Sequence, residues 1–170
     1  MREVYAGRRG DAVNFASCER GHVCRSAPIK ARCRASASAF TSTSARTNVQ
    51  DGTIIHVSHD GPYTRPGGYP TIIGSDVTIG HGAIVHACVI EDACLIGMHA
   101  TVLDGATIKK NGFVGAGAVI PPGKTVGERE LWLGNPAKLV RVLSDRDVES
   151  LYYSSTHYVK LKDRYLESGD

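Results

Sequence analysis

The chain has 170 residues, 42% of them hydrophobic, and a formal net charge of +3. This length suits one domain, the small charge gives no sign of a nucleic-acid partner, and no apolar run is long enough to cross a bilayer. The five cysteines include no CxxC pair. Neither a disulfide framework nor a cysteine zinc site is therefore indicated, and a reducing, cytoplasmic compartment is expected.

Residues 1–45 differ in composition from the rest of the chain. They hold eight Lys and Arg against three Asp and Glu, and 32–45 is almost wholly Arg, Ala, Ser and Thr. The repeat found in the next region has no counterpart here. We predict that this atypical N-terminal region is poorly ordered, or only loosely packed on the end of the following domain. Strong hydrogen-exchange protection throughout the region would contradict that prediction.

Two explanations compete for this composition. Arg, Ser and Ala with few acids are typical of a mitochondrial transit peptide. Removal of such a peptide would, however, leave a repeat domain without its first coils and with an uncapped apolar end. The alternative is a disrupted reading frame: 32–45, back-translated with chosen GC-rich codons and read in another frame, can give an alternating, strand-like sequence. We favour the second explanation.

Residues 46–133 carry a repeat of isoleucine or valine at every sixth position. A period this short means that each unit cannot bury its own apolar side and must stack on its neighbours. We therefore predict a mainly β protein, a parallel β-helix of hexapeptide repeats. Residues 59–70 contain two turns rich in Gly and Pro and are expected to form a protruding loop. The repeated positions, with one five-residue step, are Ile73, Ile79, Val85, Ile90, Ile96, Val102, Ile108, Val114 and Ile120.

Residues 134–170 are predicted to form a turn and a C-terminal helix. The turn falls at 133–136, and the helix of about 20 residues starts at Ser144-Asp145, with Asp147 in capping-box position. Its apolar stripe is expected to pack along the solenoid wall, so its role is that of a structural clamp. The residues on that stripe are Val148, Leu151, Tyr152, Ser155, Val159, Lys162 and Leu166.

Two histidines fall one above the other when the repeat is folded into coils. Three hexapeptides make one triangular coil, so residues 18 apart stack at a spacing of about 4.8 Å. Ile55 and Val85 are 30 apart, and removal of the 12-residue loop leaves 18. His56 and His86, the residues that follow them, should therefore share a face. Both imidazoles are then close enough to bind one metal at roughly 2.0–2.1 Å.

A third histidine, His81, does not fit this pair within one chain. It follows Ile79 by two residues and lies on the preceding side of the triangle. It is predicted to meet the pair of a neighbouring subunit around a three-fold axis, in a closed cyclic oligomer. Three histidines with an open fourth position lower the pKa of a zinc-bound water toward ~7.

These residues resemble the gamma-class carbonic anhydrases. The resemblance implies a left-handed parallel β-helix, a homotrimer, and a zinc or iron ion at each subunit interface. It also implies that His56 and His86 come from one chain and His81 from the next, and that Gln50 positions bound water or bicarbonate. The stretches that carry it are 48–56 (NVQDGTIIH), 79–86 (IGHGAIVH), 95–98 (LIGM), 133–138 (LGNPAK), Tyr153-Ser154 and Tyr158-Val159.

The activity implied by this resemblance is the reversible hydration of carbon dioxide to bicarbonate, in which a metal-bound hydroxide attacks the substrate. One supporting motif is out of place. Members of the family carry Arg-Gly-Asp shortly before the NVQDG segment, and here Arg9-Gly10-Asp11 precedes Asn48 by 37 residues. We do not transfer the role of that motif to these residues, and turnover that is weak or absent is consistent with its loss.

Three other functions suit the same fold. A hexapeptide-repeat acyltransferase uses a histidine as general base on an acyl-coenzyme A thioester, and a metal-dependent thioesterase would use the same three histidines. A trimeric scaffold without activity would use the metal only to hold its subunits together. Fold alone does not separate these functions. The register of three histidines favours the carbonic anhydrase hypothesis, because a transferase needs only one.

Overall fold

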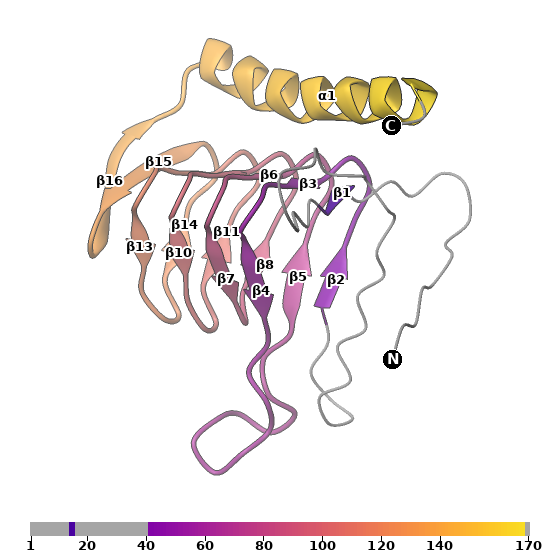
Figure 1. Ribbon diagram of the computed structural model, residues 1–170. Helices are drawn as coiled ribbons and strands as arrows, with labels where there is room; N and C mark the ends of the chain where they lie inside the picture. The colour runs from indigo at the N-terminus through magenta and orange to yellow at the C-terminus, as the bar shows by residue number, and fades with distance from the viewer. Residues whose placement is uncertain (1–13, 16–40, 169–170) are drawn as a thin grey trace, which may run out of the picture.

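The computed structural model describes residues 14–15 and 41–168, which form a β-helix followed by a hairpin and a helix (Figure 1). Successive short strands turn from one side of a triangular coil to the next, so the strands of each side belong to every third position in the chain. All pairings between coils are parallel. The predicted mainly β, parallel β-helix is confirmed.

Three sheets line the sides of the triangle. We call the one that carries His56 and His86 the histidine sheet, the one under the C-terminal helix the helix-covered sheet, and the remaining one the third sheet. The histidine sheet contains β4 (Ile54–His56), β7 (Ile84–His86), β10 (Thr101–Val102) and β13 (Val119–Ile120). The third sheet contains β2 (Thr41–Thr43), β5 (Thr71–Ile73), β8 (Val89–Ile90), β11 (Thr107–Ile108) and β14 (Thr125–Val126). The helix-covered sheet contains β1 (Asn14–Phe15), β3 (Asn48–Val49), β6 (Thr78–Ile79), β9 (Leu95–Ile96), β12 (Phe113–Val114), β15 (Glu130–Gly134) and β16 (Ala137–Val142).

The core is the column of aliphatic side chains that the six-residue period predicts. All nine repeated isoleucines and valines are at most 1% exposed. Each points inward because side chains alternate between the two faces of a strand. Cys88 and Cys94 are also buried inside the coils as free thiols, and burial raises the pKa of each to about 12. The two described cysteines therefore form no disulfide with each other.

The solenoid begins earlier than the composition suggested. β2, at Thr41–Thr43, pairs in parallel with β5, five residues before the predicted start of the domain at 46. β1 likewise pairs with β3 through Asn14 and Phe15. The remainder of the N-terminal region, including Arg9-Gly10-Asp11, lies outside the described residues, and its predicted disorder stays a prediction.

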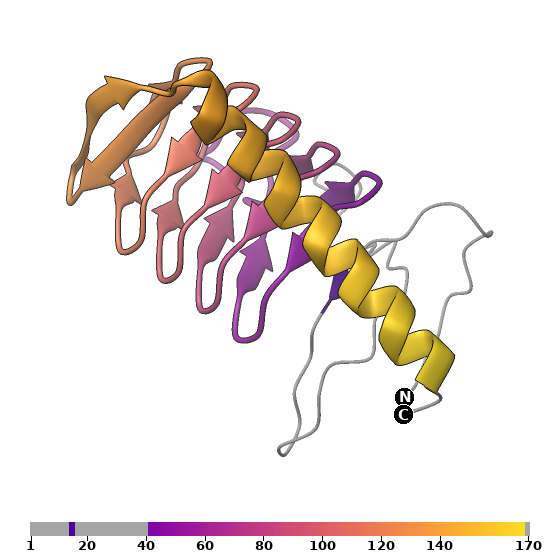
Figure 2. The same cartoon turned by 90° about the horizontal axis from the view of Figure 1, so that it is seen from above.

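Helix α1 (Asp145–Ser168) lies along the helix-covered sheet, where it packs on β3 and β6 (Figures 1 and 2). It is 24 residues long, and Leu151 and Ser155 on its inner face are 2% and 1% exposed. Tyr152 was expected on that face but is 39% exposed, because the strip that touches the sheet is narrower than the predicted stripe. The side chain of Leu166 lies outside the described set.

A hairpin that the sequence did not predict joins the coils to α1. The turn expected at 133–136 connects β15 to β16, which pair in antiparallel fashion at the end of the solenoid. The Trp132 side chain, 8% exposed, closes that end of the core. The described part of the chain contains no helix with the length and apolar character that a membrane crossing would need.

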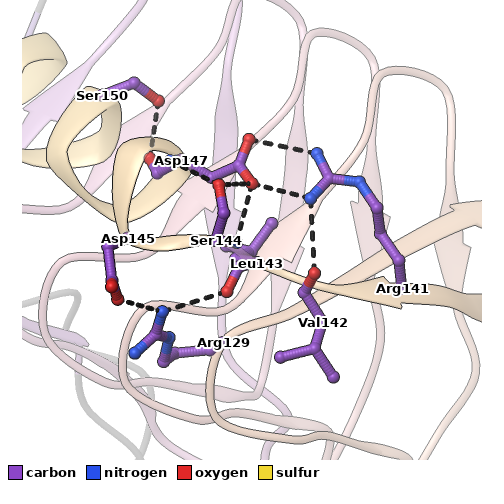
Figure 3. A network of polar contacts seen from close by, with 8 residues as sticks. All are labelled: Arg129, Arg141, Val142, Leu143, Ser144, Asp145, Asp147 and Ser150. Atoms are coloured by element: carbon purple, nitrogen blue, oxygen red, sulfur yellow. Dashed lines mark hydrogen bonds and ion pairs between the residues drawn. The ribbon is translucent and has the colours of Figure 1, made fainter.

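The start of α1 is held by the predicted capping box and by two arginines (Figure 3). The Asp147 amide donates to Ser144 Oγ at 3.2 Å, and the Ser144 amide donates to Asp147 Oδ2 at 2.8 Å. Arg141 from β16 makes a 2.7 Å ion pair with Asp147, and Arg129 makes a 2.6 Å pair with Asp145. These contacts fix the direction in which the helix leaves the hairpin.

Candidate metal centre

His56 and His86 lie side by side on the outer face of the histidine sheet, as predicted. β4 and β7 pair so that Ile55 faces Val85 and His56 faces His86. Because Ile55 and Val85 point toward the core, alternation turns the two histidines outward. Their ring centroids are 5.1 Å apart, and His56 Nδ1 lies 3.1 Å from His86 Nε2.

The loop leaves the solenoid and returns without changing the register of the coils. At its base the Ser58 amide donates to the Tyr69 carbonyl at 3.1 Å, and the Tyr69 amide donates to the Ser58 carbonyl at 2.9 Å. The segment between these residues projects beyond β4 and β5 (Figure 1). This closed base is why subtracting the loop gave the correct pairing of His56 with His86.

Asp104, which the sequence analysis did not single out, is bound to His86. Its Oδ1 accepts a hydrogen bond from His86 Nδ1, and its Oδ2 accepts one from the Ser58 hydroxyl at 2.7 Å. Partial burial opposes ionisation of this carboxyl, but the bonds from Ser58 and His86 outweigh it and hold the pKa of Asp104 below its usual value. β7 and β10 pair with an offset of 17 residues, so Asp104 lies one position beyond the residue in line with His86, and the six-residue period gave no signal for it.

Thr71, also unforeseen, fixes the backbone beside both histidines. Its buried hydroxyl donates to the His56 carbonyl and accepts from the Ala87 amide at 2.9 Å. The Ala87 amide also donates to the His56 carbonyl at 2.9 Å. Thr71 therefore couples the two strand ends on which the histidines stand.

His81 lies apart from the pair, on the corner between β6 and β7. Its side chain is 49% exposed, and its Nδ1 is 4.0 Å from Asp51 Oδ2. Among the residues that the structure describes, no three His, Cys, Asp or Glu side chains of one chain converge to hold a metal. One protomer thus brings together two of the three predicted ligands.

Gln50, to which the resemblance gives the positioning of water or bicarbonate, is hydrogen-bonded to Asn48. Its Nε2 donates to Asn48 Oδ1 at 2.7 Å, and Asn48 Nδ2 donates to Thr78 Oγ1 at 2.9 Å. Asn48 is 2% exposed beneath α1, and Thr78 Oγ1 reaches Ser154 on that helix at 3.4 Å. These bonds link Gln50 to α1 through Asn48 and Thr78, and its expected role toward water or bicarbonate stays a prediction.

The histidine pair fits a bound metal ion. Two nitrogens that ligate one tetrahedral zinc at 2.0–2.1 Å lie about 3.3 Å apart, close to the 3.1 Å separation between His56 Nδ1 and His86 Nε2. Metal-binding histidines commonly donate their other ring N–H to a carboxylate, and Asp104 occupies that position at His86. Zinc and iron both accept imidazole ligands.

Known proteins related to this chain show the class and the family to which it belongs. The family model for the bacterial transferase hexapeptide (six repeats) matches residues 87–122, which makes this a hexapeptide-repeat protein. Protein YrdA of Escherichia coli is 43% identical over 77% of this chain and 71% of its own. Probable carbonic anhydrase of Methanocaldococcus jannaschii is 42% identical over 72% of this chain and 71% of its own.

A plant protein and a solved structure are also similar to this chain. Gamma carbonic anhydrase 1, mitochondrial, of Arabidopsis thaliana is 42% identical over 68% of this chain and 41% of its own. The solved structure of a putative acetyltransferase from Bacillus cereus has a TM-score of 0.68 at 36% identity and covers 75% of this chain and 70% of that chain. The chain belongs to the gamma-class carbonic anhydrase family, and its fold is a left-handed parallel β-helix with one C-terminal helix.

Proposed function

We propose that this protein is a metal-dependent enzyme that catalyses the reversible hydration of carbon dioxide to bicarbonate. The observation that carries the proposal is the pair of histidines, 3.1 Å apart between ring nitrogens, one of them bound to a carboxylate, on a sheet other than the one on which α1 packs. The 42% identity to a relative described as a probable carbonic anhydrase supports this choice among the chemistries that the fold accommodates.

The metal site is shared between protomers of a homotrimer. His56 and His86 supply two ligands, and His81 of a neighbouring subunit supplies the third. The position of His81 supports this arrangement, because it stands on an exposed corner away from its own pair. The histidine sheet also exposes Ile54 and Ile84, which are 58% and 38% accessible and would be covered by the neighbour.

A zinc or ferrous ion held by three imidazoles would supply a water ligand with a pKa near neutrality and so a nucleophile for carbon dioxide. The residues of this chain would orient the ligands of that ion. Asp104 holds the His86 ring by Nδ1, and Thr71 holds the backbone on which both rings stand. We assign Gln50 the positioning of water or bicarbonate, a role that requires its amide to exchange Asn48 for the substrate.

The test combines metal content, native mass and carbon dioxide hydration in the wild type and two variants. His81→Asn should lose the metal, while His99→Asn removes an exposed corner histidine from the next coil and should keep it. Asparagine suits the positive φ of 55° at His99. About one metal per chain in an active trimer supports the proposal. A metal-free or monomeric wild type contradicts it.

Acyl transfer is the second candidate, because a solved structure at 36% identity is described as a putative acetyltransferase. A transferase would use a single histidine as general base and no metal. Consumption of acetyl-coenzyme A that persists after treatment with a chelator would favour this candidate. Hydration activity that a chelator abolishes and zinc restores would favour the first.

A further inference from the structure

We propose that Ser58 and Asp104 are positioning residues that decide which nitrogen of His86 faces the metal. The base of the protruding loop, to which Ser58 belongs, thereby sets the affinity of the site. The consequence for metal binding rests on the proposed function, whereas the orientation of the imidazole can be tested without any metal. Neither residue follows from the three-histidine pattern.

The direction of each hydrogen bond in this chain is determined by chemistry. An ionised carboxylate only accepts, so the Ser58 hydroxyl must donate to Asp104 and so must His86 Nδ1. A neutral imidazole carries one ring proton, and a proton on Nδ1 leaves Nε2 with a free lone pair. Asp104 therefore selects the form of His86 whose Nε2 can ligate.

The geometry independently points the same way. The nitrogen that Asp104 leaves free is the one that lies 3.1 Å from His56. His86 thus turns its ligating nitrogen toward the other histidine and its protonated nitrogen toward the carboxylate. If Asp104 were absent, nothing in this chain of contacts would prevent the ring from carrying its proton on Nε2.

The loop base holds Asp104 from more than one side. Ser58 is 8% exposed and is fixed by two backbone hydrogen bonds to Tyr69. The Tyr69 ring lies against Gly105, the neighbour of Asp104, where an added Cβ would stand 3.4 Å from Cε1. The Arg65 guanidinium covers the same ring at 4.4 Å from its centroid. The carboxylate is therefore oriented by the loop and not only by its own coil.

The first experiment records the ring nitrogens of His86 by NMR in the metal-free protein, at a pH where histidine is neutral. The His86→Ala spectrum assigns the signals. We expect the proton on Nδ1 in the wild type and a shift toward Nε2 in Asp104→Ala. A wild-type His86 protonated on Nε2 overturns the proposal.

The second experiment titrates Co²⁺ into the same proteins and follows its visible absorption. Loss of an outer partner of a metal-binding histidine typically costs about 10–100-fold in affinity, which we expect for Asp104→Ala. Ser58→Ala should show a smaller loss in the same direction, and Ser58→Thr should recover the wild-type affinity because it keeps the hydroxyl. Glu91→Gln, which alters a carboxylate bound to Lys109 on the third sheet, is the control and should change nothing.

The outcomes separate positioning from a merely structural role. Unchanged cobalt affinity in Asp104→Ala, together with a lower thermal midpoint, would overturn the proposal. If that variant does not fold, Ser58→Ala carries the test, and an affinity equal to the wild type overturns it. A wild type that binds no cobalt contradicts the proposed function, and the protonated nitrogen of His86 then decides the inference by itself.

Discussion

The helix-covered sheet and the histidine sheet are built from the same repeat but present opposite surfaces. Both turn isoleucine or valine inward. On the helix-covered sheet, outward-facing Thr78 is 7% exposed beneath α1, whereas outward-facing Ile84 on the histidine sheet is 38% exposed. A polar residue is covered and an apolar one is open, which is the reverse of what a lone chain should prefer. The difference indicates that the inner positions specify the fold and the outer positions specify what covers each face.

Placing a charge on the histidine sheet should have the largest effect. Ile84→Arg would put a guanidinium into the face that we assign to the neighbouring subunit, so the native mass should fall from three chains to one and the metal should be lost. Ile72→Arg is a matched control, since Ile72 is also 38% exposed but lies on the third sheet. Equal native masses for the two variants would contradict the proposed interface.

The corresponding test of the helix-covered sheet is Leu151→Ala. This side chain is 2% exposed between α1 and the coils, and its truncation should lower the free energy of unfolding by about 2–5 kcal/mol, measured by urea denaturation. Tyr153→Ala, on the same helix but 71% exposed, should stay within about 0.5 kcal/mol of the wild type. A similar small loss in both variants would mean that the helix adds little to the stability of the coils.

Removal of the helix cap should have an intermediate effect. Ser144→Ala deletes the hydroxyl that accepts from the Asp147 amide and should cost about 1 kcal/mol of unfolding free energy. Ser150→Ala removes a hydroxyl that donates to the Asp147 carbonyl within the helix and should cost less. Equal losses of unfolding free energy in Ser144→Ala and Ser150→Ala would show that the capping box does not stabilise the start of α1.

The smallest expected effect is on acid stability. The Arg141 guanidinium, followed by the Ser144 hydroxyl and amide, holds the pKa of Asp147 below its ordinary value. A depressed carboxyl pKa stabilises the fold fully above the unfolded value of about 3.9, and this contribution is lost progressively as the pH falls from there through the lower folded-state pKa.

Asp147→Asn should therefore lower the urea midpoint at about pH 6, and its difference from the wild type should begin to shrink as the pH falls below about 3.9. Glu149→Gln, an exposed helix carboxylate nearby, should run parallel to the wild type across the same range. A constant difference between Asp147→Asn and the wild type at all pH values would show that ionisation of Asp147 is not involved.

Much of this architecture follows from one number, the six-residue period. It placed the aliphatic core and, with the loop removed, the pairing of His56 with His86, because stacked strands repeat their register from coil to coil. The capping box at Ser144 followed from local chemistry alone. The ion at the site, the third ligand from a second chain and the role of Gln50 stay predictions.

The six-residue period did not predict β2, β16 or the contacts of Asp104. The sequence did not predict β2 because Thr43 occupies the inward position opposite Ile73. In the other coils of the repeat that position holds isoleucine or valine. β16 was missed because Lys138 through Val142 are exposed on both faces, so no alternation marks the strand. The bonds of Asp104 depend on side-chain torsions at a corner and on a residue from the loop base, which a period does not encode.

The closed base of the loop makes that segment exchangeable. Because Ser58 and Tyr69 return the chain to one place, the length of the excursion is uncoupled from the spacing of the coils, and a doubled length would cost only about 0.6 kcal/mol in closure entropy. Gly68 is a loop position that cannot be changed freely, since a Cβ there would lie 2.2 Å from the Ser58 carbonyl oxygen. Arg65 covers the Tyr69 ring and must also be kept, so residues 59–64 form a natural graft site, in which new sequences can be displayed beside the histidines on an unchanged scaffold.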